Sequence, residues 1–271
     1  MRNFKTWAGH RAVVTGASSG IGAEYARQLA TLGVNLVIAA RRMDRLQALA
    51  LELSSKHGVK VDCCQVDLVA PEGPRVLFDF ATADSQQVTV LINNAGLAKY
   101  GSFLEFPYED HFSTLAVNSV APTEITYRFV KHMLAHRKQS YVTQVASIAA
   151  FQPVGNFAVY SGTKGYLMYF SESLAYELRG TSVKIMCLCP GGTYTEFFEH
   201  SGQKITSSGR KTMMSSEKVV RLGIQAMLAG KVIFVPGFLN QLACFLPRLI
   251  PRHLGQFFAA KAMGRAVEKA S

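Results

Sequence analysis

The sequence predicts an α/β protein built on a doubly wound parallel sheet of about seven strands. Short apolar runs rich in β-branched residues recur along the chain, and stretches long enough for crossover helices separate them. The runs are residues 12–14, 35–39, 61–66, 88–92, 141–145, 183–188 and 232–235. Continuous apolar runs are typical of strands that helices cover on both faces, so the strand–helix alternation indicates this fold class.

The chain is predicted to form one domain over residues 1–271. Its 49% hydrophobic and 17% charged residues exclude a disordered chain. No linker-like segment, internal repeat or low-complexity stretch divides it. The core is expected at about 8–238, with two additions to the sheet: a polar, basic substrate loop at 194–216 and an apolar C-terminal tail at 239–271. The tail carries basic residues at Arg248, Arg252, Lys261 and Arg265.

The charge and the cysteines bear on partners and compartment. A net charge of +11 favours anionic partners, but no long basic tract indicates nucleic acid. Five cysteines in apolar runs make a poor disulfide framework and indicate buried thiols in a reducing compartment. His132 and His136 have helical spacing but lack a third ligand nearby, so no metal site is expected.

Neither a signal peptide nor a membrane span is expected. The first residues lack the apolar core of a signal peptide, and the longest uncharged run, 140–163, is too polar for a spanning helix. We therefore expect a cytoplasmic protein.

A glycine-rich loop follows the first predicted strand. Residues 15–22 read TGASSGIG and lead into a predicted helix over 21–32. Glycines let the backbone approach a ligand closely, and a helix N-terminus offers free N–H groups to a diphosphate. The pattern predicts a nucleotide-phosphate site formed by Gly16, Ser18, Ser19, Gly20, Ile21 and Gly22.

The second predicted strand is followed by Arg41 and Arg42, with no acidic residue. In dinucleotide-binding folds an acidic residue here holds the ribose 2′-hydroxyl, whereas an arginine accommodates a 2′-phosphate. The sequence therefore favours NADP(H) over NAD(H). The alternative is that both arginines merely open a solvated helix.

Tyr160 and Lys164 stand four residues apart, on one face of a predicted helix. A lysine beside a phenol is expected to lower the pKa of the phenol, which suits acid–base catalysis. Ser147 lies just past the predicted strand at 141–145, where its hydroxyl can reach the same place. Alone, this tyrosine–lysine spacing is common on protein surfaces.

Together these residues resemble the short-chain dehydrogenase/reductase family. The resemblance runs from about residue 8 to about 238 and rests on six elements in family order. They are T-G-x-x-x-G-x-G at 15–22, N-N-A-G at 93–96, Asn118, Ser147, the Tyr160/Lys164 pair and P-G-G-T-Y-T at 190–195. It implies a Rossmann-type fold and a nicotinamide-dependent oxidoreductase acting on a carbonyl or an alcohol.

The resemblance also implies a catalytic tetrad. Tyr160 would be the general acid in reduction and the base in oxidation. Lys164 would lower the pKa of that tyrosine and hold the nicotinamide ribose, and Ser147 would bind the substrate oxygen. Asn118 would complete the tetrad through a helix distortion and a water-mediated proton relay, although alone it reads as a satisfied buried amide.

Further cofactor contacts are implied in the same way. Asp67 would touch the adenine amino group, although alone it reads as a turn or N-cap residue. The remaining implied contacts are Leu68, Asn94, Ala95, Gly96, Pro190, Gly191, Thr193 and Thr195, together with Tyr160 and Lys164.

Two departures from the family pattern bear on cofactor and assembly. Ser19 stands where many NADP-preferring relatives have a basic residue, so Arg41 is expected to supply most of the 2′-phosphate recognition, helped by Arg42. The C-terminal tail replaces a glycine-rich ending that is common among tetrameric members. A homodimer or homotetramer paired through helices around 105–135 and 155–179 is still expected.

The substrate is expected to be a small hydrophobic ketone or alcohol, of acyl, lipid-like or steroid-like type. Apolar residues cluster around the site motifs: Leu97, Phe103, Phe151, Pro153, Val154, Phe157, Phe197 and Phe198. A non-catalytic NADP-binding or sensing module and a membrane-surface scaffold are the alternatives. The basic, apolar tail would either lie at a membrane interface, making the protein peripheral to the membrane, or pack over the substrate loop or a second subunit.

Overall fold

A computed structural model of the chain describes residues 7–249, 251, 254–255, 257, 261, 264 and 266–269. Residues 1–6 of the expected domain, and Arg252 and Arg265 of the tail, lie outside the described residues.

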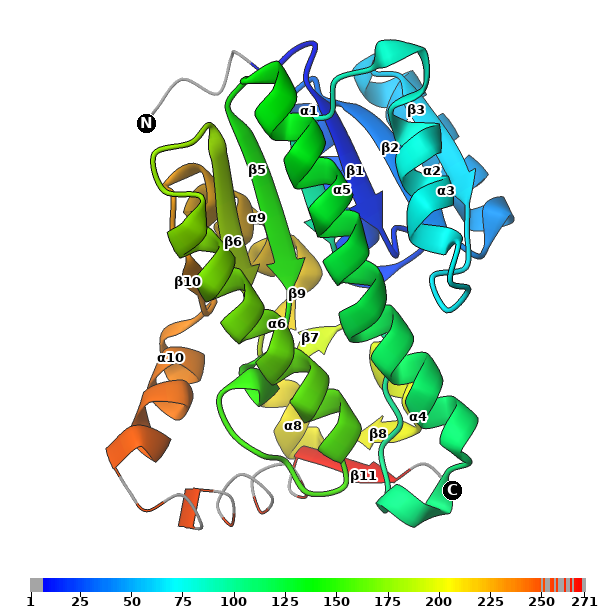
Figure 1. Cartoon of the computed structure of the whole chain (residues 1–271). Helices are drawn as coiled ribbons and strands as arrows, with labels where there is room; N and C mark the ends of the chain where they lie inside the picture. Colours follow the sequence, from blue (N-terminus) through cyan, green and yellow to red (C-terminus); the bar gives the residue numbers. More distant parts are fainter. Residues whose placement is uncertain are drawn as a thin grey trace.

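Seven parallel strands form the central sheet, in the order β10-β6-β5-β4-β1-β2-β3 (Figure 1). The chain builds outward from β1 to β3, then returns to place β4 on the other side of β1. Each strand coincides with one of the predicted runs, so the predicted fold class is confirmed. The strands are β1 (Arg11–Thr15), β2 (Asn35–Ala40), β3 (Val61–Gln65), β4 (Val90–Asn93), β5 (Ser140–Val145), β6 (Val183–Leu188) and β10 (Ile233–Phe234).

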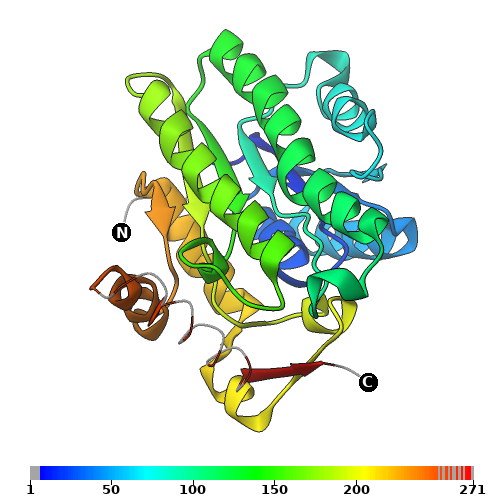
Figure 2. The ribbon, with the colours of Figure 1, turned by 60° about the horizontal axis from the view of Figure 1, so that its bottom comes forward.

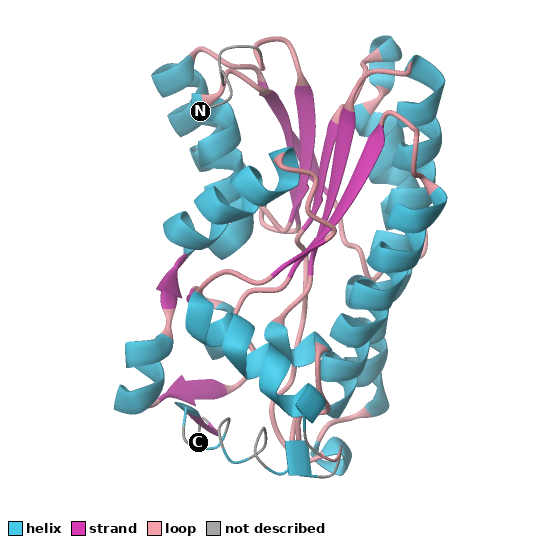
Figure 3. Cartoon of the chain, turned by 90° about the vertical axis from the view of Figure 1, so that its left-hand side faces the viewer, coloured by secondary structure: helices cyan, strands magenta, loops and turns pink. Residues whose placement is uncertain are grey.

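Helices cover both faces of the sheet, which lies edge-on between them in Figure 3. One face packs against α1 (Gly20–Thr31), α2 (Met43–His57) and α9 (Ser216–Leu228). The other packs against α3 (Gly73–Ala81), α5 (Ala121–His136) and α6 (Ala158–Glu177). Alternate residues of one strand point into the cores on the two faces of the sheet. Both sets are buried, which explains why the strands are continuous apolar runs in the sequence.

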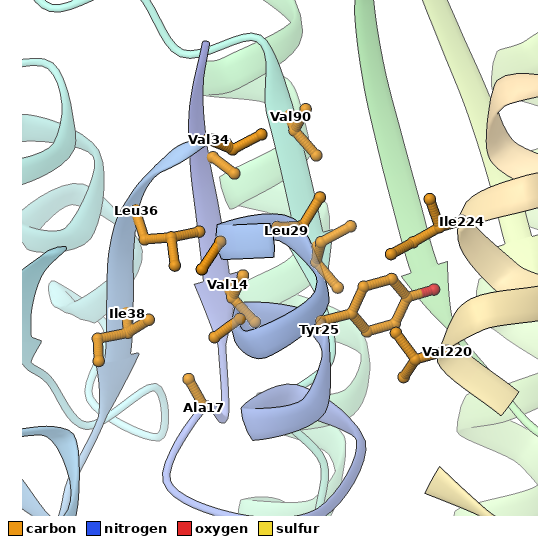
Figure 4. Packing of buried hydrophobic residues seen from close by; sticks show 14 of the residues in the cluster. Val14, Ala17, Tyr25, Leu29, Val34, Leu36, Ile38, Val90, Val220 and Ile224 are labelled. Carbon is orange, nitrogen blue, oxygen red and sulfur yellow. The ribbon is translucent and has the colours of Figure 1, made fainter. Parts of the chain in front are cut away.

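The first core shows how closely the helices approach the sheet. Tyr25 of α1 is fully buried beside Leu29, Val220 and Ile224 (Figure 4). A Cβ atom on Gly223 would lie 2.7 Å from the Tyr25 hydroxyl, so this glycine of α9 makes room for the ring. This packing fixes the position of α1 and of the glycine-rich loop that precedes it.

The remaining elements gather mostly beyond the carboxyl ends of the strands. In chain order they are η2 (Ala83–Ser85), η3 (Phe103–Glu105), α4 (Tyr108–Leu115), a π-helical turn (Ala116–Val120), η5 (Ile148–Ala150), β7 (Thr193–Tyr194), α7 (Phe197–His200), β8 (Gln203–Ile205), α8 (Ser207–Thr212), β9 (Met214–Ser215), α10 (Phe238–Phe245), η6 (Leu246–Leu249) and β11 (Val267–Lys269).

The two predicted additions to the sheet meet in space. Strand β11 of the tail pairs antiparallel with β8 of the substrate loop, and β7 pairs with β9 (Figure 2). Residues 194–216 together with β11 are called the cap below. Thr206 N–H and its hydroxyl both donate to the Ala266 carbonyl, at 3.0 and 3.1 Å. Ala266 and β11 of the tail therefore lie against the substrate loop.

Helix α10 is amphipathic. Cys244 is buried against the sheet, while Phe238, Leu239, Leu242 and Phe245 are exposed. Within the described part of the chain, no helix is both long and apolar enough to cross a bilayer.

Candidate active site

The glycine-rich loop joins β1 to α1, and its glycine positions leave no room for a side chain. Gly16 and Gly20 have φ of +65° and +56°, a region that favours glycine. A Cβ atom on Gly22 would lie 2.4 Å from both the Asn94 Nδ2 and the Gly16 carbonyl oxygen. Ser19 precedes the helix without a side-chain capping hydrogen bond. The first N–H groups of α1 therefore stay suited to an anionic ligand.

Asn94 ties the glycine-rich loop to the end of β4. Its Nδ2 donates to the carbonyls of Thr15 and Gly16, at 2.9 and 3.2 Å. The Thr15 hydroxyl accepts from the N–H groups of Asn94 and Ala95, at 2.9 and 3.0 Å. These bonds hold two loops that are distant in sequence side by side, as a nucleotide cradle requires.

The two arginines after β2 take different positions. Arg42 Nη2 donates to the hydroxyls of Ser18 and Ser19, at 3.0 and 3.2 Å, so its guanidinium lies on the glycine-rich loop. The Arg41 side chain is exposed, and only the carbonyl of this residue makes a hydrogen bond within the described chain, with Gln65 Nε2 at 3.0 Å. Arg42 thus lies on the glycine-rich loop, and the expected contact of Arg41 with a 2′-phosphate stays a prediction.

Asp67 and Leu68 follow β3. The Asp67 carboxylate accepts from the Val69 N–H at 3.0 Å, a local turn contact, and Leu68 is buried in the core. The structure thus shows the turn role of Asp67, and its contact with an adenine stays a prediction.

Three side chains of the predicted tetrad come together at the end of β5. The Ser147 side chain lies beside the Tyr160 hydroxyl and accepts from the Ala149 N–H at 3.1 Å. Lys164 Nζ lies 5.5 Å from the centre of the Tyr160 ring and donates to the Val145 carbonyl at 2.9 Å. All three meet because β5 ends where α6 begins its first turns.

Asn118 lies within the π-helical turn between α4 and α5. Its amide pairs with the backbone of Leu97 in both directions at 2.8 Å and donates to the Thr163 hydroxyl at 3.1 Å. A Cβ atom on Gly96 would stand 3.5 Å from Asn118 Oδ1 and 3.6 Å from Lys164 Nζ. The asparagine is therefore both a satisfied buried amide and a neighbour of the catalytic lysine.

Burial dominates the ionisation of the pair. It raises the pKa of Tyr160 to about 12, against the opposing effect of the Ser147 hydrogen bond. It also lowers the pKa of Lys164 to about 8. The pKa of Tyr160 is therefore not lowered overall, contrary to the prediction from the sequence, because desolvation by burial raises it. Tyr160 is a protonated phenol at neutral pH.

The segment after β6 closes the cradle. The Pro190 carbonyl accepts from the Ile148 N–H at 2.9 Å, and Thr193 donates to the Gly191 carbonyl at 3.0 Å. A Cβ atom on Gly20 would lie 2.9 Å from Thr195 Cγ2. This stretch thus runs from the Ser147 loop to the glycine-rich loop.

Apolar side chains surround Tyr160. Its ring centre lies 4.5 Å from that of Phe157 and 5.5 Å from that of Phe197. Val154 and Phe198 join the same cluster, as do Tyr100 and Val267, which sequence reasoning missed. Of the other predicted wall residues, Phe103 lines a pocket beside Tyr160. Leu97 and Phe151 pack into separate core clusters.

His132 and His136 both hydrogen-bond the backbone of Val88. His132 Nε2 accepts from the Val88 N–H at 3.2 Å, and His136 contacts the Val88 carbonyl at 3.0 Å. No group of three His, Cys, Asp or Glu side chains suited to a metal gathers among the described residues.

Sequence comparisons agree with this arrangement. The profile described as short chain dehydrogenase matches residues 10–206. The very-long-chain 3-oxoacyl-CoA reductase of Phaeosphaeria nodorum is 32% identical over 187 residues, which are 68% of this chain and 53% of that protein. This chain thus spans about half of the fungal reductase. The 17-beta-hydroxysteroid dehydrogenase type 3 of Mus musculus is 27% identical over 242 residues, or 87% of this chain and 76% of the mouse protein.

Solved structures share the whole architecture. A 7beta-hydroxysteroid dehydrogenase has a TM-score of 0.85 at 22% identity, covering 97% of this chain and 99% of that one, and shows the fold. A short-chain dehydrogenase from Sphingobium yanoikuyae in complex with NADPH has a TM-score of 0.78 at 26% identity, covering 90% and 97%. The matched profile, the relatives and the assembled Ser147, Tyr160 and Lys164 place the chain in the short-chain dehydrogenase family, as an oxidoreductase acting on CH–OH groups.

Proposed function

We propose that this chain is an NADP(H)-dependent oxidoreductase that interconverts a hydrophobic carbonyl compound and its secondary alcohol. The observation that carries the proposal is the placement of Ser147 and Lys164 beside the Tyr160 hydroxyl and ring, within the apolar cluster that holds Phe157, Phe197 and Val267. One polar centre inside an apolar wall suits a substrate with a single reacting oxygen and apolar substituents.

The nicotinamide, when bound, supplies or accepts the hydride. Ser147 orients the substrate oxygen by hydrogen bonding. Tyr160 donates its phenolic proton to that oxygen during reduction, which its raised pKa permits at neutral pH. Lys164, held by the Val145 carbonyl, lies beside Tyr160 and faces Gly96 at the cofactor loop. Asn118 holds that loop through Leu97.

Arg42 supports the choice of NADP(H). A guanidinium already resting on Ser18 and Ser19 lies beside the loop that would hold the diphosphate. Arginine binds phosphate through two parallel hydrogen bonds, so the 2′-phosphate has a ready partner there. Solved relatives are in complex with NADPH or with NAD, so the proposal rests on the arginines of this chain.

The names of the relatives support an acyl or steroid-like substrate. One relative reduces 3-oxoacyl-CoA and another acts on hydroxysteroids, by their names. The apolar cluster over Tyr160 fits both classes.

A panel of ketones and alcohols tests the proposal. The panel holds 3-oxoacyl thioesters, steroids, simple ketones and sugars, each with NADPH or NADP⁺ and with NADH or NAD⁺. Turnover of an apolar carbonyl, followed at the absorbance of the reduced nicotinamide, supports the proposal. Tight NADPH binding without turnover of any compound would instead indicate a non-catalytic sensing module.

The assembly and location are proposed from exposed apolar surface. Helices α5 and α6 expose Tyr127, Tyr169 and Tyr176, which favours a homodimer or homotetramer paired through these helices. Gel filtration of wild type and Tyr169→Glu tests the pairing. The protein is proposed to be cytoplasmic, with the exposed face of α10 touching membrane, and co-sedimentation with anionic vesicles tests that contact.

A further inference from the structure

Glu196 reaches from the cap to the arginines that follow β2. Its Oε1 lies 2.6 Å from Arg45 Nη1, and its Oε2 lies 3.2 Å from Arg42 Nη1. His200 Nε2 lies 3.5 Å from the same Oε2. Hydrogen bonds from Arg45 and then Arg42 hold the pKa of Glu196 below its usual value, so the carboxylate is ionised at neutral pH. One acidic residue thus bridges two arginines.

The same Arg42 guanidinium rests on the glycine-rich loop. While Nη1 binds Glu196, Nη2 binds the hydroxyls of Ser18 and Ser19. In dinucleotide-binding folds an arginine near the end of this strand accommodates the 2′-phosphate of NADP. The Glu196 carboxylate therefore forms an ion pair with Arg42, the same guanidinium that is proposed to bind the 2′-phosphate.

A bound 2′-phosphate would meet Glu196 in one of two ways. It would displace the carboxylate from Arg42 and lose the energy of that ion pair, or it would share the guanidinium with a nearby negative charge. Both weaken the binding of a cofactor that carries the 2′-phosphate. Neither changes the binding of a cofactor with a free 2′-hydroxyl. Glu196 thus acts on one cofactor only.

We propose that Glu196 is a specificity-determining residue that lowers the preference of this chain for NADP(H) over NAD(H). The inference rests on the proposed function, since it presupposes 2′-phosphate binding at Arg42. Because the ion pairs are about one-third exposed, the effect is modest. Coulomb repulsion of this kind near a surface predicts roughly a threefold to tenfold change in affinity.

The experiment measures two adenosine fragments by calorimetry, which separates the 2′-phosphate contact from turnover. The fragments are adenosine 2′,5′-bisphosphate and adenosine 5′-monophosphate. Three proteins are compared: wild type, Glu196→Gln and Glu199→Gln. Glu199 is the matched control because it is an exposed acid in α7, the short helix that Glu196 precedes as N-cap, and it has no ion pair among the described residues. Thermal unfolding verifies that all three are folded.

Glu196→Gln should bind the bisphosphate about threefold to tenfold more tightly than wild type, with an unchanged affinity for the monophosphate. The difference should shrink in high salt, and Glu199→Gln should match wild type. Equal affinities in the two variants would overturn the inference. Weaker bisphosphate binding in Glu196→Gln would overturn it as well, because Glu196 would then position Arg42.

The proposed function fails in a different way. A wild-type chain that binds the monophosphate at least as tightly as the bisphosphate, with Arg42→Ala changing neither, removes the 2′-phosphate site itself. A wild type that prefers the bisphosphate keeps that site, and the Glu196→Gln result alone then decides the inference.

Discussion

The cofactor side and the cap meet at Tyr160 and are built in different ways. On the cofactor side, backbone approaches backbone so closely that a Cβ atom on Gly16 would lie 2.8 Å from Ala95 Cα. The cap is made of strands of two or three residues and helices of four and six residues, and it covers Tyr160 with apolar side chains. The cofactor side therefore tolerates almost no added atom, whereas changes in the cap should alter substrate choice more than folding.

The largest effect should come from Tyr160, where the two regions meet. Tyr160→Phe removes the hydroxyl proposed to protonate the substrate oxygen, and general acid catalysis contributes typically ~10²–10⁴-fold. We expect kcat to fall by that factor. NADPH affinity, measured by fluorescence titration, should stay close to that of wild type because the glycine-rich loop is untouched. Wild-type turnover in this variant would exclude the proposed mechanism.

Lys164 should produce the next largest effect, on stability. Its pKa is about 8 in the folded chain and 10.5 as the ordinary value, so between these pH values the unfolded chain binds more protons. Stability should then rise with pH across this window, by about 3 kcal/mol in total. Lys164→Met removes the titrating group and should lack this rise.

Denaturant titrations from about pH 7 to pH 10 measure that difference. The raised pKa of Tyr160 affects wild type and Lys164→Met only above this range, because the unfolded phenol loses its proton near pH 10. Parallel stability curves for the two proteins would show that burial of the lysine has no energetic cost.

The sequence could predict most of the cofactor side because its signals are local. The apolar runs that became β1, β2 and β4, and the glycines between β1 and α1, are readable over a few residues. Tyr160 and Lys164 share a helix face by spacing alone. The spacing also suggested that Lys164 would lower the tyrosine pKa, but the depth of burial decides that balance, and burial depends on the whole fold.

The cap was predictable in extent but not in contacts. Val267 reaches Tyr160 only because β11 pairs with β8, and Glu196 reaches Arg42 from a distant part of the chain. Such pairings depend on tertiary structure and leave no periodic signal. The same limit applies to Arg42: its hydrogen bonds to Ser18 and Ser19 could not be predicted from the sequence, and the choice of Arg41 as the main phosphate ligand stays a prediction.

The next effect in size should come from Arg42, on the cofactor side. Arg42→Ala removes the guanidinium on Ser18 and Ser19 and should weaken NADPH binding by roughly 1.5–3 kcal/mol, the range for hydrogen bonds to charged groups. NADH binding should change little. Arg41→Ala is measured beside it, because the sequence favours Arg41 as the main 2′-phosphate ligand, and the variant with the larger loss of NADPH affinity identifies that ligand. Equal losses of both cofactors in Arg42→Ala would assign this arginine to the structure of the loop.

The smallest effect belongs to Val267 in the cap. Its side chain is 3% exposed and packs in the cluster around Tyr160, so Val267→Ala removes two buried methyl groups and should cost about 1–2 kcal/mol of stability. Leu239→Ala, on the exposed face of α10, should cost much less. Because the lost methyl groups belong to the apolar cluster at Tyr160, kcat/KM should change severalfold between bulky and small substrates, while NADPH affinity stays unchanged. A uniform loss for every substrate would mean that β11 supports the fold of the cap without shaping the substrate site. A loss of NADPH affinity would show that cap and cofactor side are not separable.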